Sequence, residues 1–154
     1  MTAASTTDAL AVELRPAAGP PVSVTLPEGW GTSTDGAWSL ADAPDHRAHV
    51  RIATYGKGVL TDGDAEGFLT SFIESWPTYT VDRHVRHVTC GHFVGVEVSG
   101  HGAGDGWERA RFHLFLLVDP AASQKGAVVL ITGRDDAWEA VHPALDRAVH
   151  GAHG

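Results

Sequence analysis

The chain has 154 residues, the length of one ordinary domain, which is enough to bury one substantial core without disulfides or metals. Its formal net charge is −8 at pH 7, so an acidic surface would repel both nucleic acid and anionic membranes. We therefore expect neither a nucleic-acid partner nor membrane insertion.

Cysteine usage and the N-terminus bear on the compartment. The single cysteine, Cys90, excludes an internal disulfide, and its position in an apolar stretch predicts a buried, reduced thiol. Met1 to Ala18 has no basic start followed by an apolar core, so no secretion signal is expected. Arginine strongly outnumbers lysine and asparagine is absent, a bias that suggests a high-GC bacterial source. We expect a cytoplasmic bacterial protein.

The N-terminal third predicts a lead-in followed by strands. Residues 1–21 are rich in Ala, Thr and Pro and predict mostly a flexible lead-in, although Ala9 to Leu14 could form a brief turn of helix. A single domain is expected over residues 22–150. Its first strand is marked by alternation of apolar and polar residues from Val22 to Leu26, and Pro27-Glu28-Gly29 ends it.

Two further strands are predicted before the first helix. Ala37 to Ala41 is a weak strand, preceded by a loop over Gly31 to Gly36, and His49 to Tyr55 is a stronger one. From Asp64 to Trp76 the apolar residues follow the spacing of one helical face, and Pro77 ends that helix.

The second half of the chain predicts four strands and a final helix. The strands are expected over Thr78 to Val88, His92 to Ser99, Trp107 to Val118 and Gly126 to Thr132. The glycine-rich segment Gly100 to Gly106 is interpreted as a turn between two strands, not as a phosphate loop, because no helix follows it. A second apolar helical face runs from Asp135 to Val149, with a kink or a late start at Pro143. This order predicts an α+β fold in which helices pack on an antiparallel sheet.

The segment Val22-Ser23-Val24-Thr25-Leu26-Pro27-Glu28-Gly29-Trp30, the Trp76-Pro77 pair, the strand meander and the terminal helix resemble the PsbP-like superfamily. That superfamily includes the PsbP, LpqN, DcrB-like and Ran-binding Mog-like groups. The resemblance implies an α/β/α sandwich with a central antiparallel sheet of about six to seven strands and two main helices. It implies a non-enzymatic binding role, and one DcrB-like branch resembles chaperones of secreted effectors. The sequence departs from LpqN because it has no lipid-accepting cysteine near its start.

The sequence contains no complete catalytic or metal-binding signature. Ten histidines invite a metal hypothesis, but Cys90 and His92 have no identified third ligand. Glu139, His142, Asp146 and His150 recur at helical spacing and are interpreted as a solvated stripe, with a surface metal as the alternative. We predict no cofactor, no metal and no enzymatic activity.

The strand from Trp107 offers the best candidate surface. Arg109, Arg111, His113 and Phe115 alternate on one of its faces, and arginines beside aromatic groups suit a protein interface. The alternative is that a second layer covers Phe115 and Leu117 while the arginines pair with local carboxylates such as Glu97. Trp30 and Trp38 are interpreted either as exposed anchors or as core or lid residues.

The sequence thus predicts a small non-enzymatic binding protein, an adaptor or chaperone whose partner is another protein. The predicted contacts are Trp30, Trp38, Arg109, Arg111, His113 and Phe115. Two alternatives stay open: a carrier of a small apolar ligand, and an accessory enzyme that uses histidine acid/base groups such as His113. The sequence defines no oligomeric state.

Overall fold

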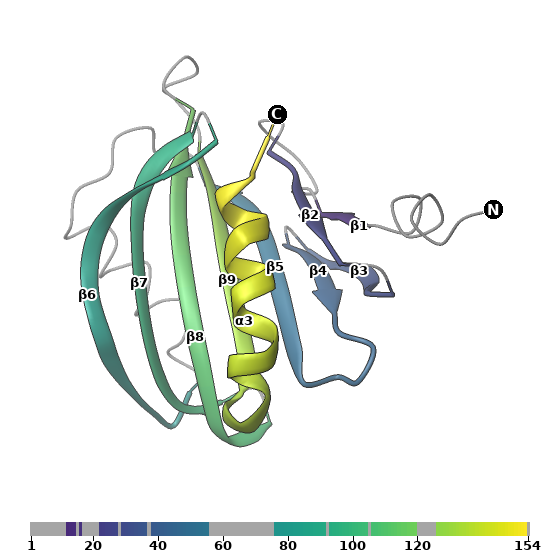
Figure 1. The fold of residues 1–154 in the computed structure, drawn as a ribbon, viewed down its shortest axis with the longest axis vertical. Coiled ribbons are helices and arrows are strands. Elements are labelled where there is room, and N and C mark those ends of the chain that lie inside the picture. The colour runs from purple at the N-terminus through teal and green to yellow at the C-terminus, as the bar shows by residue number, and fades with distance from the viewer. Residues whose placement is uncertain are drawn as a thin grey trace.

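The computed structural model describes residues 12–14, 16, 22–27, 29–36, 38–55, 76–91, 93–104, 106–119 and 126–153. Its elements in chain order are β1 (Val12–Leu14), β2 (Val24–Leu26), β3 (Gly31–Asp35), β4 (Trp38–Asp42), β5 (Ala48–Tyr55), β6 (Thr78–Cys90), β7 (Phe93–Gly104), β8 (Trp107–Val118), β9 (Gly126–Arg134) and α3 (Asp135–His150). Seven strands form one antiparallel sheet in the order β3-β4-β5-β9-β8-β7-β6, and β1 pairs with β2 separately (Figure 1).

The predicted antiparallel sheet is confirmed. β6 to β9 form a meander whose neighbours are consecutive in the chain, and β9 then pairs with β5 over eight residues. This pairing joins the two halves of the chain in the middle of the sheet. Its core positions are β-branched and apolar residues that alternate between the two faces, as a sheet buried on both sides requires.

Two segments differ from the sequence-based expectation. Val12–Leu14, placed in a brief turn of helix, is a strand that pairs with β2, and Leu14 is 2% exposed. Gly31–Asp35, expected as a loop, is strand β3 and forms an edge hairpin with β4. All five residues of β3 are exposed and mostly polar, so the backbone hydrogen bonds to β4, and no apolar alternation, define this strand.

The glycine-rich segment was also misassigned. β7 extends to Gly104, so most of Gly100 to Gly106 is strand and the turn is confined to its end. A Cβ on Gly100 would lie 2.1 Å from the Thr80 carbonyl oxygen, and one on Gly104 would lie 2.1 Å from the Trp76 ring. These glycines are needed where β6 and Trp76 approach the backbone of β7 closely.

The C-terminal helix α3 is confirmed over Asp135–His150. It begins at Asp135 despite Pro143, so the late start is not observed. Asp135 and Asp136 in its first turn and Arg147 and His150 in its last complement the helix dipole. The helix predicted from Asp64 lies outside the described residues except for Trp76. One helix, not the two expected, is therefore seen in the part of the chain that the structure describes.

β8 and β9, in the middle of the large sheet, are buried on both faces. On one face α3 and the β1-β2 pair cover a core that includes Ile52, Phe115, Val129, Leu145 and Val149. The opposite face carries a second cluster built around Phe112, Leu114, Val98 and Leu130, with Trp76 packed edge-on against Phe112. Within the described ranges no helix has the length and apolar character needed to cross a membrane.

Candidate functional site

A polar cleft lies between α3 and the sheet at β6, β7 and β8. Its volume is about 390 Å³. Its polar lining comes from four elements: Asp82 and Arg86 of β6, Glu97 and Ser99 of β7, Arg111 and His113 of β8, and Trp138, His142, Asp146 and His150 of α3. We call this feature the histidine cleft. It forms because the polar residues of β8 precede the apolar ones on the same face, so α3 packs tightly over Phe115 and Leu117 and leaves space over His113.

A buried carboxylate–imidazole hydrogen bond lies at the base of the histidine cleft. The side chains of Glu97 and His113 are 8% and 7% exposed, and His113 Nε2 lies 2.6 Å from Glu97 Oε1. Because an ionised carboxylate accepts hydrogen bonds only, His113 Nε2 is the donor, which leaves Nδ1 of the neutral ring with a lone pair. Arg86 Nε lies 3.5 Å from the second Glu97 oxygen.

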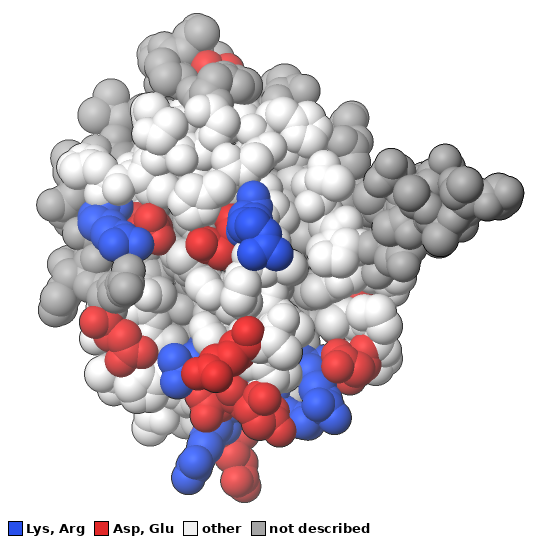
Figure 2. All heavy atoms as spheres, viewed as in Figure 1, with Lys and Arg blue, Asp and Glu red and all other residues white. Residues whose placement is uncertain are grey.

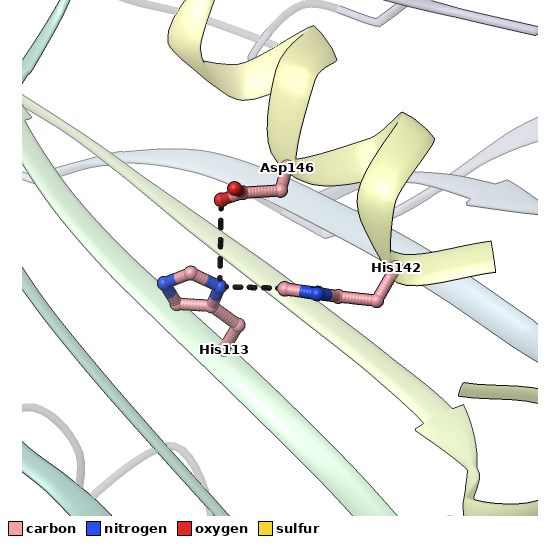
Figure 3. A group of neighbouring side chains, drawn as sticks. All are labelled: His113, His142 and Asp146. Carbon is pink, nitrogen blue, oxygen red and sulfur yellow. Dashed lines mark hydrogen bonds and ion pairs between the residues drawn. The ribbon is translucent and has the colours of Figure 1, made fainter. Parts of the chain in front are cut away.

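α3 brings two further groups to His113. His113 Nδ1 lies 2.9 Å from His142 Nε2 and 3.7 Å from Asp146 Oδ1. Figure 3 shows these side chains turned towards one another across the space between β8 and α3. The His142 ring stacks on Trp138, with 4.5 Å between ring centroids, and Trp138 in turn packs on Gly133 of β9. This stack fixes the orientation of the His142 ring.

One oxygen in the histidine cleft has no hydrogen bond. Asp146 Oδ1 is buried and accepts none from the described residues. His150 Nδ1 lies 3.4 Å away but bonds the Asp146 carbonyl oxygen at 2.8 Å. A buried carboxylate oxygen without a donor costs roughly 1–3 kcal/mol or more, so this atom is suited to a ligand.

The electrostatics favour a neutral His142 imidazole and an ionised Glu97 carboxylate. Burial, then the proximity of His113, lowers the pKa of His142, although Asp146 and Glu97 oppose this. Burial also tends to raise the pKa of Glu97, but the hydrogen bond from His113 and the electrostatic interactions with His113 and Arg86 outweigh it and lower that pKa. The cleft therefore presents lone pairs and negative charge together.

An arginine-rich surface adjoins the histidine cleft at the start of β8. Most of the charged side chains on this side of the molecule gather at its lower end, around the beginning of α3 (Figure 2). Arg111 Nε donates to Asp135 Oδ1 at 2.7 Å, and Arg134 Nε donates to Asp136. Arg109 is exposed and has no ion pair with any described residue, although it lines two shallow grooves with Glu108 and Asp135. We call the exposed surface of Glu108, Arg109, Arg111 and Asp135 the arginine rim.

Structural comparison identifies the fold. LpqN, described as involved in cell envelope biogenesis of Mycobacterium tuberculosis, superposes with a TM-score of 0.65 and 11% identity over 99% of this chain and 96% of its own. Cyanobacterial PsbP from Synechocystis sp. PCC 6803 gives 0.66 and 11% over 86% and 85% of the two chains. The Saccharomyces cerevisiae Ran-binding protein Mog1p gives 0.63 and 10% over 93% and 94%. This protein has the PsbP-like fold. No family model and no curated protein matches the sequence.

In this fold the residues predicted to contact a partner differ in how exposed they are. Phe115 is fully buried under α3, His113 is 6% exposed, and Trp30 is 9% exposed within the core. Trp38 is half-buried and packs against the second cluster. Arg109 and Arg111 remain accessible, and Arg111 pairs with Asp135, not with Glu97. A second layer does cover Phe115 and Leu117, as the alternative interpretation had it.

The histidine cleft was not predicted from the sequence, because its residues lie far apart along the chain. His113 was a candidate, but Glu97 precedes it by 16 residues and His142 follows it by 29, and strand register and helix packing bring them together. The sequence feature that pointed to the cleft was the i, i+4 spacing of His142 and Asp146, which places both side chains on one face of a helix. Their stripe was expected to be solvated, whereas both are half-buried and face His113.

Proposed function

We propose that this protein is a small binding protein without catalytic activity that docks another protein on the arginine rim. The observation that carries the proposal is Arg109, an exposed arginine with no ion pair among the described residues, in a surface where Arg111 and Arg134 are paired. An unpaired exposed guanidinium offers five donors to a carboxylate on a partner, and arginine is enriched at interface hot spots.

The fold is consistent with this role. Mog1p, which has the same fold, is a Ran-binding protein, so the architecture serves protein recognition in at least that case. The one cysteine does not suggest nucleophilic chemistry. Cys90 is fully buried, and burial, with smaller contributions from Glu97 and Asp146, raises its pKa to about 12. The thiol is therefore protonated and inert near neutral pH.

The test is capture of partners from an extract of the native host on immobilised protein. We expect a stoichiometric partner on the wild type that is lost with R109A. The matched control is R147A, because Arg147 is also exposed and forms no ion pair among the described residues but lies about 18 Å along α3 from Asp135. Loss with both variants, or with neither, would reject the arginine rim as the docking surface.

A second candidate function is acid/base catalysis in the histidine cleft. The buried Glu97–His113 pair, with the lowered pKa of His142 nearby, is an arrangement that enzymes use for a general base. Incubation with a metabolite extract, followed by mass spectrometry, separates the two candidates. Catalysis predicts depletion of a metabolite that H113Q abolishes and R109A leaves unchanged, whereas the docking proposal predicts no depletion. The cleft is lined mainly by charged and imidazole groups. Such a lining suits a polar ligand better than the small apolar ligand of the carrier alternative.

A further inference from the structure

We propose that the histidine cleft binds one divalent transition-metal ion of the zinc class through His113 Nδ1, His142 Nε2 and an Asp146 carboxylate oxygen. This inference does not rest on the proposed docking function. Two imidazole nitrogens and a carboxylate are the donors that zinc, and its close relatives cobalt and nickel, accept in proteins.

The distances between the three donor atoms are compatible with their binding one shared metal ion. The three donor atoms all lie within 4.8 Å of one another, and two of the separations are 2.9 Å and 3.7 Å. Ligands about 2.1 Å from a tetrahedral zinc are roughly 3.4 Å apart, so small side-chain rotations are sufficient. Metal entry replaces the His142 to His113 hydrogen bond, and His142 changes tautomer so that Nε2 carries a lone pair.

Glu97 supports the metal as a positioning residue. Its carboxylate accepts a hydrogen bond from His113 Nε2 at 2.6 Å, so that in the neutral ring the lone pair is on the other nitrogen, Nδ1, which is aimed at His142 and Asp146. Histidines that bind metals usually donate their second ring N–H to a carboxylate in this way, which orients the ring and increases its basicity. The buried pair thus has a role that packing alone does not explain.

Asp146 provides a second argument for a metal ion, independent of the distances between the donor atoms. Its Oδ1 is buried and accepts no hydrogen bond from the described residues, although the atom faces His113. A cation at this point would give that oxygen a partner. The nearby arginines do not occupy the position, because Arg86 pairs with Glu97 and Arg111 with Asp135.

The site has three protein ligands and opens into the cleft. Closed four-ligand sites are typical of structural zinc, whereas three-ligand sites keep a coordination position for water or another ligand. We therefore infer an ion with one exchangeable ligand on the side of the cleft.

The experiment is titration of tag-free, chelator-treated protein with Zn²⁺ by calorimetry and with Co²⁺ by visible absorption. We expect one ion per chain and intense tetrahedral Co²⁺ bands. H142Q and D146N should each weaken binding at least tenfold and remove the rise in Tm that Zn²⁺ produces. H46N is the control, because His46 and Asp42 form an exposed pair elsewhere, and Asn tolerates the positive φ of 59° there.

E97Q tests the positioning role separately. We expect it to weaken Zn²⁺ binding about 10- to 100-fold and to alter the Co²⁺ spectrum, while Tm in chelator shows that the variant folds. Failure of the wild type to bind one equivalent would overturn the proposal. So would loss of binding with H46N when H142Q and D146N bind like the wild type.

Discussion

At the residue scale, Glu97 is a carboxylate that is 7% exposed and therefore costly to bury unless its oxygens are bonded. His113 satisfies one oxygen from β8, and Arg86 lies beside the other from β6. An apolar pair of similar volume would hold these strands together at least as well in many proteins. The charged pair is better explained by the chemistry of the histidine cleft than by stability.

The lowered pKa of Glu97 predicts a definite pH dependence of stability. A carboxyl group whose folded-state pKa lies below its unfolded value of about 4.3 stabilises the fold fully above that value. This stability is lost as the pH falls through the folded-state pKa. The facing charged and titratable groups are Arg86, His113 and, from α3, His150.

We therefore expect E97Q to reduce the free energy of unfolding near pH 7 by about 1–3 kcal/mol and to have a smaller effect below pH ~4. Urea unfolding between pH 3 and 7, in the presence of chelator, measures this. E139Q is the control, because Glu139 is exposed on α3. An E97Q effect of the same size at every pH would contradict the assignment.

Cys90 gives a second prediction at this scale. Because its pKa is raised to about 12, the native thiol should resist alkylation by iodoacetamide at pH 8 and react promptly in 8 M urea. The free energy of unfolding should change with pH in the opposite direction to that expected for Glu97. A raised folded-state pKa stabilises below the unfolded value, and the free energy of unfolding should fall as the pH rises above about 9. Rapid native alkylation would show that the thiol is accessible.

At the element scale, periodicity predicted the elements with a clear apolar face. β8 has one apolar face and one mixed face, and α3 repeats apolar residues at helical spacing, so both were found. β3 was missed because Gly31–Asp35 has no buried residue, and a strand defined by backbone pairing alone leaves no pattern. Val12–Leu14 was missed because β2, outside any local window, decides its conformation.

The candidate site was predicted less completely, for a related reason. His113 and Arg111 were identified on β8, but their partners come from β7 and α3. Register places Glu97 opposite Phe115, two residues along β8 from His113, and no local sequence signal fixes that register. Helical spacing showed that His142 and Asp146 share a face, but it did not show that this face meets the sheet.

Glycines in β7 give a prediction for the sheet beside the histidine cleft. G100A would place a Cβ 2.1 Å from the Thr80 oxygen and 2.6 Å from the Phe112 ring, so β6 has to move. We expect a loss of about 1–3 kcal/mol in the free energy of unfolding, measured by urea denaturation. G31A is the control, because nothing lies within 4 Å of its Cβ position. Equal effects of the two changes would contradict the close approach of β6 to β7.

At the scale of the whole molecule, α3 closes the core and forms one wall of the histidine cleft. Leu145 is fully buried between α3 and the sheet. L145A should reduce the free energy of unfolding by about 2–5 kcal/mol because it leaves a cavity in the core, whereas E139A on the exposed side should change it by less than ~0.5 kcal/mol. A small effect of L145A would mean that α3 is not packed as described.

The measurement that tests the docking proposal most directly is site-specific photo-crosslinking in host extract. A photoreactive amino acid replaces the exposed Glu108 of the arginine rim in one variant and Arg147 in another, which leaves Arg109 in place, and the products are identified by mass spectrometry. We expect the same protein that wild type captures to crosslink at position 108 and not at position 147. Crosslinking at 147 alone, or at neither position, would contradict docking on the arginine rim.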